Sequence, residues 1–156
     1  MKAEENSREW VEIVSRFNKP DVGKSIWQII NSLGPYLLLW VAMFFSLQIS
    51  YLLTLALSLL AAGFLVRIFI IFHDCGHSSF FSSSKANRIV GTILGSLVFT
   101  PYDRWHRDHA IHHKTVGNLD KRGNGDVWTL TTEEYKSLSR GKKLYYQLYR
   151  HPIILF

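Results

Sequence analysis

Two long apolar segments dominate the pattern of hydrophobic and polar positions along the chain. The first covers residues 26–49 and the second covers residues 51–72, and each is long enough to cross the hydrocarbon core of a bilayer as an α-helix. No charged residue occurs from Ser25 to Val66, a run of 42 positions. A soluble domain, in which about 25% of residues are charged, does not leave such a run uncharged. The pattern therefore predicts a helical hairpin that spans a membrane twice.

The only polar residues at the junction between the two segments are uncharged, namely Ser46, Gln48 and Ser50, which is typical of a tight turn. None of the 18 Lys and Arg residues lies in this turn. By the positive-inside rule, both open ends of the hairpin are expected at the cytoplasmic face of the cell membrane, in a multi-pass arrangement. Arg67 lies about one turn before the end of the second segment and is expected to reach back to the interface.

The rest of the chain predicts further helices and no strand. Residues 1–24 are interpreted as a cytosolic N-terminal segment, and residues 25–156 as the N-terminal part of a membrane domain. The apolar run over residues 89–100 is too short to span a bilayer and predicts an interfacial or re-entrant helix, with a buried soluble helix as the alternative. Thr131 and Glu134 form a capping-box pattern, which predicts a helix start. The expected fold class is all-α.

Composition and charge exclude several classes of protein. The chain has 156 residues, of which 47% are hydrophobic and 14% aromatic, so it is not a disordered chain. Its single cysteine, Cys75, excludes a disulfide framework and is expected to be a small packing residue. The net charge of +6 is interpreted as the basic side of a membrane protein, with no nucleic-acid partner.

Histidines are concentrated just after the second apolar segment. Six of the seven fall within 41 residues. His73 and His77 are four residues apart, and His109, His112 and His113 stand at spacings of three and four, so each set shares one face of a helix. Imidazole is a ligand of iron, copper, zinc and nickel. These five histidines are therefore predicted to hold one metal ion or a pair at the end of the hairpin.

Other readings of the histidines remain open. A zinc protease of the His-Glu-x-x-His type would carry Glu where this chain has Asp74, and membrane-interface histidines can also act as pH-sensitive groups. His106 is either a weak ligand or a surface histidine. Three carboxylates are candidates to accept the second ring N–H of a metal-bound histidine, with solvated charges as the alternative: Asp74, Asp103 and Asp108.

The histidine-rich segments resemble the first two histidine boxes of the membrane fatty acid desaturases. Residues 73–81 read His-Asp-Cys-Gly-His-Ser-Ser-Phe-Phe, and residues 105–113 read Trp-His-Arg-Asp-His-Ala-Ile-His-His. Residues 117–135 resemble the block that follows the second box in the bacterial acyl-lipid branch. The second apolar segment resembles that of the delta-5 acyl-lipid desaturases. The resemblance covers about residues 15–156.

This resemblance implies a non-haem di-iron centre that uses O₂ to convert two adjacent methylenes of an acyl chain into a cis double bond. It also implies membrane lipids as substrate and a ferredoxin-like protein as electron donor. A different histidine-box oxygenase, such as a hydroxylase or a ketolase, and a non-catalytic membrane remnant are the alternatives. Four basic residues can either steer an acidic electron carrier or hold anionic lipid, and binding of anionic lipid is the preferred interpretation. These residues are Lys121, Arg122, Lys142 and Lys143.

One family feature is absent from these residues. The family carries a third His-x-x-His-His box after a second pair of membrane helices, whereas the only histidine after the second box here is His151. The sequence thus resembles the N-terminal half of a desaturase, an incomplete fold of that type. By itself it is expected to bind metal weakly or incompletely and to lack turnover.

Overall fold

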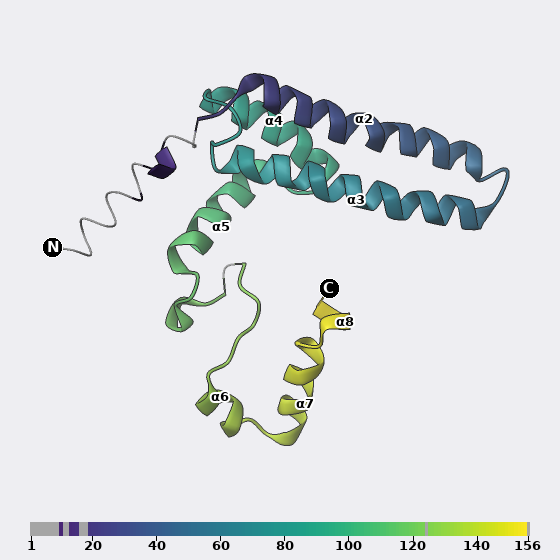
Figure 1. Ribbon diagram of the computed structural model, residues 1–156. Helices are drawn as coiled ribbons and strands as arrows, with labels where there is room; N and C mark the ends of the chain where they lie inside the picture. The colour runs from purple at the N-terminus through teal and green to yellow at the C-terminus, as the bar shows by residue number, and fades with distance from the viewer. Residues whose placement is uncertain (1–9, 11–12, 16–18, 124, 156) are drawn as a thin grey trace. The chain divides into compact units, whose positions relative to one another are not determined.

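The fold is helical throughout the described residues (Figure 1). The computed structural model describes residues 10, 13–15, 19–123 and 125–155. It contains α2 (Val22–Ser46), α3 (Tyr51–Gly76), α4 (Ser84–Leu97), α5 (Tyr102–Thr115), a 3₁₀ turn (Leu119–Lys121), α6 (Thr132–Ser137), α7 (Arg140–Tyr149) and α8 (Pro152–Leu155). The expected all-α class is confirmed. The chain forms two compact units, Met1–His106 and Arg107–Phe156.

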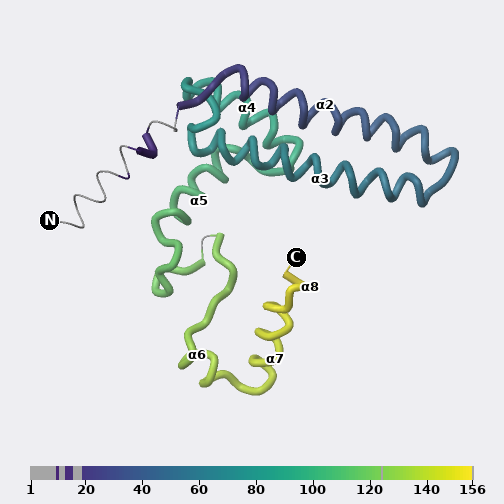
Figure 2. Tube along the Cα trace, viewed as in Figure 1, coloured from purple at the N-terminus to yellow at the C-terminus, as the bar shows by residue number. Residues whose placement is uncertain are grey.

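Helices α2 and α3 form an antiparallel hairpin (Figure 2). The first helix begins at Val22 instead of residue 26, because the Asp21 carboxylate accepts a hydrogen bond from the Lys24 backbone N–H at 3.1 Å and caps the helix there. It ends at Ser46 instead of residue 49, and Ser46 Oγ lies 2.7 Å from Thr54 Oγ1 across the turn. Most of residues 1–24, expected as a separate segment, lie outside the described residues.

Both hairpin helices are long and apolar enough to cross a membrane. Their most apolar windows have a mean hydropathy of 1.6 and 2.5, yet only 11% and 22% of those windows are buried within the protein. A core helix of a soluble protein would be mostly buried. Large apolar side chains instead cover the outside of both helices, including Leu38, Phe44 and Leu59. Such a surface is suited to a lipid environment.

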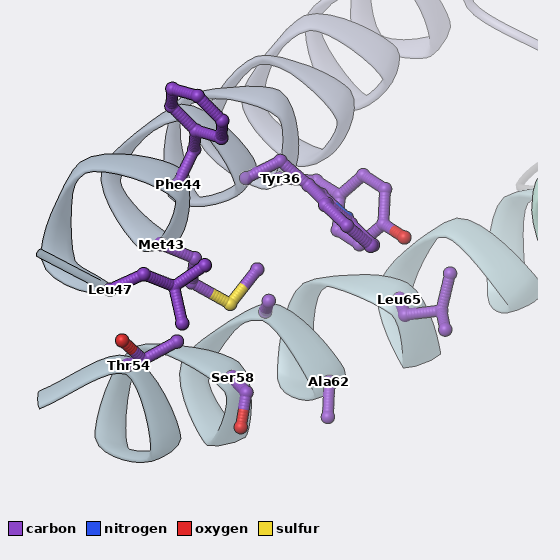
Figure 3. A pocket seen from close by; sticks show the side chains of 10 residues that line it. Tyr36, Met43, Phe44, Leu47, Thr54, Ser58, Ala62 and Leu65 are labelled. Carbon is purple, nitrogen blue, oxygen red and sulfur yellow. The ribbon is translucent and has the colours of Figure 1, made fainter. Parts of the chain in front are cut away.

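An apolar groove opens between the two helices toward the closed end of the hairpin (Figure 3). Large side chains of α2 face small side chains of α3 there, and this difference in size leaves the space between them. The α2 side includes Tyr36 and Met43, and the α3 side includes Ser58 and Ala62.

Helix α4 packs against α3 and is longer than expected. It begins at Ser84, five residues before the predicted run over 89–100, because Ser83 Oγ accepts a hydrogen bond from the Ala86 backbone N–H at 3.3 Å. It ends at Leu97. Its inner face carries a buried Leu94, whereas Ile93 on the outer face is 59% exposed. The helix thus exposes an apolar side chain on its outer face, and its interfacial placement stays a prediction.

The start of α5 is anchored on the end of α3. The Tyr102 hydroxyl donates a hydrogen bond of 2.8 Å to the Cys75 carbonyl, and burial raises the pKa of Tyr102, which keeps this donor protonated. Trp105 packs on Phe72 with ring centroids 4.7 Å apart. A Cβ at Gly76 would lie 2.5 Å from the Trp105 ring, so only glycine permits this approach. Cys75 is buried in the same core, in agreement with its expected packing role.

The second unit is organised around a tryptophan and an ion pair. Trp128 packs against three tyrosines of α7, and its ring centroid is 5.0 Å from that of Tyr146. The predicted capping box of Thr131 and Glu134 is confirmed at the start of α6. Arg122 donates from both of its terminal nitrogens to the Glu134 carboxylate, at 3.0 and 2.8 Å. Arg122, which was considered for binding anionic lipid or steering an acidic carrier, thus forms an ion pair within its own unit.

Acidification is expected to release this ion pair only well below neutral pH. The hydrogen bonds from Arg122 hold the pKa of Glu134 at about 2, below its ordinary value of 4.5. Because the folded-state pKa is the lower one, the stabilisation is complete above pH 4.5 and disappears as the pH falls through about 2. In thermal unfolding, Glu134→Gln should be less stable than the wild type at neutral pH. The difference should vanish below a pH of about 2, and a difference that persists there would contradict this assignment.

Candidate metal centre

The first pair of histidines lies at the open end of the hairpin. Helix α3 continues four residues beyond the expected segment 51–72, so His73 occupies its last turn and His77 is its C-cap. The two Nε2 atoms are 3.3 Å apart, and the ring centroids are 4.5 Å apart. The i and i+4 spacing therefore brings two imidazole nitrogens close together.

The distance between these nitrogens fits shared metal coordination. Two imidazole nitrogens, each about 2.1 Å from one ion, lie about 3.0–3.4 Å apart when the angle at the metal is between a right angle and a tetrahedral angle. The observed 3.3 Å falls in this interval. The separation of the two nitrogens is thus compatible with coordination of one ion.

Aromatic packing restricts the orientation of His73. The Trp105 ring lies 5.5 Å from the His73 ring, and Phe69 lies 6.5 Å away on the same helix. The His73 Nδ1 atom is 3.5 Å from the Asp74 carboxylate, which is at the outer limit of a hydrogen bond. The contact of Trp105 with His73 was not predicted from the motifs, although Trp105 is the first residue of the second histidine-rich segment.

The second pair lies on α5. The Nε2 atoms of His109 and His113 are 3.0 Å apart, again in the interval for shared coordination, and the ring centroids are 4.5 Å apart. His112, between them in sequence, is half-buried, and its ring is 5.8 Å from that of His109. The same helix therefore presents a second ready pair of nitrogens within the Arg107–Phe156 unit.

Asp126 is the carboxylate that the sequence did not single out. Its Oδ1 lies 3.1 Å from the His112 Nδ1, and both side chains are less than a quarter exposed. In proteins, a metal-bound histidine commonly donates its second ring N–H to a carboxylate in this way. No motif could have indicated Asp126, because its approach to His112 depends on the path of the loop after α5.

The remaining candidates occupy other environments. His106 stacks on Tyr102, with ring centroids 5.9 Å apart and planes at 8°. Asp103 pairs with Arg88 at 2.9 Å. Asp108 does not belong to the group of described residues whose geometric conditions suit a metal ligand, namely side-chain ligand atoms that lie close to one another. Four predicted ligands do meet them, two in each unit: His73, His77, His109 and His113.

Comparison with known families identifies the class of this protein. The family model for fatty acid desaturases matches residues 49–156, which include both histidine pairs. The chain belongs to the fatty acid desaturase family.

Individual relatives support the same assignment. The chain is 52% identical to a fatty acid desaturase of Bacillus subtilis over 92% of its own length and 41% of the relative's. It is 38% identical to an endoplasmic-reticulum omega-3 fatty acid desaturase of Vigna radiata, over 57% of the chain and 23% of the relative. An sn-1 acyl-lipid omega-3 desaturase (ferredoxin) of Nostoc is 34% identical, over 57% of the chain and 25% of the relative. The chain thus spans less than half the length of these relatives. No solved structure was found to match it.

Proposed function

We propose that the two histidine pairs bind iron, as a non-haem di-iron centre, in a membrane-bound acyl-lipid desaturase. The observation that carries the proposal is the matched separation of ligand nitrogens within the pairs, 3.3 and 3.0 Å. Family membership supports it, because the matched residues include both pairs. The two apolar helices and the family together indicate association with a membrane.

The proposed ligands are the five histidines indicated by the sequence. His73 and His77 form one pair, His109 and His113 form the other, and His112 adds a further nitrogen that Asp126 orients. A ligand set made of neutral nitrogens alone suits iron, whereas magnesium and calcium prefer oxygen.

The reaction consumes O₂, two electrons and two protons for each double bond formed, and it releases two molecules of water. Iron bound by these histidines would supply the oxidising power for removing hydrogen from an unactivated methylene. The side chains themselves hold and orient. Trp105 and Phe69 pack beside the His73 ring and restrict its orientation, and Asp126 fixes which nitrogen of the His112 ring faces outward.

The proposed substrate is an acyl chain of a membrane lipid, and the proposed electron donor is a ferredoxin-like protein. The name of the Nostoc relative supports both, since that protein is called an acyl-lipid desaturase that uses ferredoxin. We place the open end of the hairpin, with its histidines, at the cytoplasmic face, because Lys and Arg residues gather on that side of the two spans. The delta-5 position remains a prediction from resemblance.

Lipid analysis tests this function directly. The complete reading frame that encodes this sequence is expressed in a bacterium, and the fatty acids of its lipids are analysed by gas chromatography and mass spectrometry. New cis double bonds, absent when His73 and His109 are both alanine, are the expected result. A hydroxy or keto product would instead assign the protein to another class of oxygenase. If the protein is inserted in the membrane and loaded with iron but the lipid composition stays unchanged, the proposal is wrong.

Replacing Asp126 is expected to weaken metal binding without unfolding the helix. Asp126→Asn keeps the size of the side chain but removes the charge that orients the His112 ring, so iron affinity should fall about tenfold. Competition with a metal chelator measures this change. Asp103→Asn is the matched control, since Asp103 pairs with Arg88 instead of a histidine. Equal affinity in both variants would remove His112 from the proposed ligand set.

A further inference from the structure

Arg67 is a charged residue within the apolar span of α3. It stands six residues before His73, which corresponds to about 9 Å along the helix. Its side chain is exposed on the outer surface of the hairpin, where the neighbouring Val66 and Ile70 also face outward. A charged side chain in such a segment is rare and usually has a functional reason.

The guanidinium of Arg67 is held by an amide instead of an acid. Its Nη2 donates a hydrogen bond of 2.7 Å to Asn31 Oδ1 on α2, and its central carbon lies 5.8 Å from the Phe64 ring centroid. Among the described residues, no carboxylate lies within ion-pair distance of Arg67. The positive charge therefore lacks a counter-ion from this part of the chain, while the side chain keeps further N–H donors.

The side-chain amide of Asn31 is oriented so that its Nδ2 can also donate a hydrogen bond. Its Oδ1 accepts from Arg67 and, at 3.4 Å, from Ser32 Oγ, which sets the amide orientation because Arg67 can only donate. The described residues provide no acceptor for its Nδ2. Two adjacent side chains from two helices thus offer N–H donors beside an uncompensated positive charge.

The neighbouring face of α2 has the composition of a membrane interface. Lys24 and Trp27 precede Asn31 by seven and four residues, so they lie on the same face of that helix, and Trp27 is 62% exposed. Tryptophan and lysine are enriched at the level of lipid headgroups, where their polar ends reach water. This face lies toward the open end of the hairpin, where Arg67 can extend its side chain.

We propose that Arg67 and Asn31 bind the phosphate group of a phospholipid, and that Lys24 adds positive charge to this site. Guanidinium groups recognise phosphate through parallel hydrogen bonds, and the free donors of Arg67 and Asn31 supply them. The phosphate comes from a lipid because the donors lie on the apolar outer surface of the hairpin. The proposal rests on the proposed membrane-spanning hairpin, and it is independent of desaturation.

Native mass spectrometry of the full chain in detergent tests the site. Phosphatidylglycerol and diacylglycerol with the same acyl chains are titrated in parallel, because only the first carries a phosphate. The wild type should retain about one phosphatidylglycerol, and Arg67→Gln should lower that affinity at least about tenfold through loss of charge-assisted hydrogen bonds. Asn31→Asp should release the lipid as well, because it provides Arg67 with its own carboxylate.

Arg88→Gln is the matched control. It removes the same charge from the same unit, but Arg88 already has Asp103 as a partner at 2.9 Å, so its lipid binding should equal that of the wild type. Circular dichroism shows whether each variant keeps its helices, and iron content should be unchanged in all of them. The proposal is wrong if diacylglycerol binds as tightly as phosphatidylglycerol, or if Arg67→Gln and Asn31→Asp both retain phosphatidylglycerol as the wild type does. It is also wrong if equimolar inorganic phosphate displaces the lipid.

Discussion

Replacing His73 and His109 together by alanine is expected to remove nearly all bound metal from the protein. The double variant leaves one imidazole in each pair. Neither of the two close Nε2–Nε2 contacts, at 3.3 and 3.0 Å, therefore remains. Loss of a residue that merely orients a ligand costs about 10- to 100-fold in metal affinity, so loss of two ligands should exceed about 100-fold. Elemental analysis after loading with ferrous iron, on protein from the complete reading frame, measures the effect.

A single change at another histidine controls for nonspecific loss. His151 stands outside both pairs, and its Nδ1 accepts a hydrogen bond from the Ile153 backbone N–H at 3.4 Å. His151→Ala should bind as much iron as the wild type. If the double variant binds iron as tightly as His151→Ala does, the two pairs are not the metal ligands.

Gly91→Ala is expected to destabilise the hairpin unit markedly. A Cβ at this position would lie 2.2 Å from Cε2 of the Tyr102 ring. Tyr102 cannot move away freely, because its hydroxyl donates to the Cys75 carbonyl at 2.8 Å. Overpacking of this kind costs about 1–3 kcal/mol, and a 2.2 Å contact with a ring that is held in place belongs at the upper end of this range, above the gain of about 1 kcal/mol that alanine brings within a helix. The midpoint of thermal unfolding in detergent should fall accordingly.

Two comparisons isolate the clash from other effects. Gly63→Ala, on α3, meets no atom within 4 Å and should leave stability equal or raise it by up to about 1 kcal/mol. In a Tyr102→Ala background, Gly91→Ala should cost little, because the opposing ring is gone. An equal cost of Gly91→Ala with and without the Tyr102 ring would show that the clash is not its cause.

The helical hairpin was predictable, but its ends were not. An uncharged run from Ser25 to Val66 has few alternatives to a membrane hairpin. Helix ends depend on single hydrogen bonds such as those that Asp21 and Ser83 accept, which is why α2 and α4 begin four and five residues earlier than expected. The extension of α3 to Gly76 matters for the proposed site, since it places His73 on the helix.

The histidine pairs were predictable because helical spacing is a local property. Positions four residues apart share a face in any α-helix, and both pairs have their nitrogens close together for this reason. Asp126 and Trp105 were not predicted as their neighbours. Each contacts a histidine through the fold of a chain segment that lies 14 or more residues away in sequence, and no spacing rule reports such a contact.

The sequence by itself determined the class of fold, the apolar hairpin and the helical spacing of the histidines proposed to bind metal. These properties depend on composition and on periodicity within one helix, which are local. Only the tertiary structure decided that Tyr102 and Trp105 fasten α5 to α3, that Asp126 orients His112, and that Arg67 pairs with Asn31. Each of these contacts joins residues distant in sequence, and its geometry depends on how whole helices and loops pack.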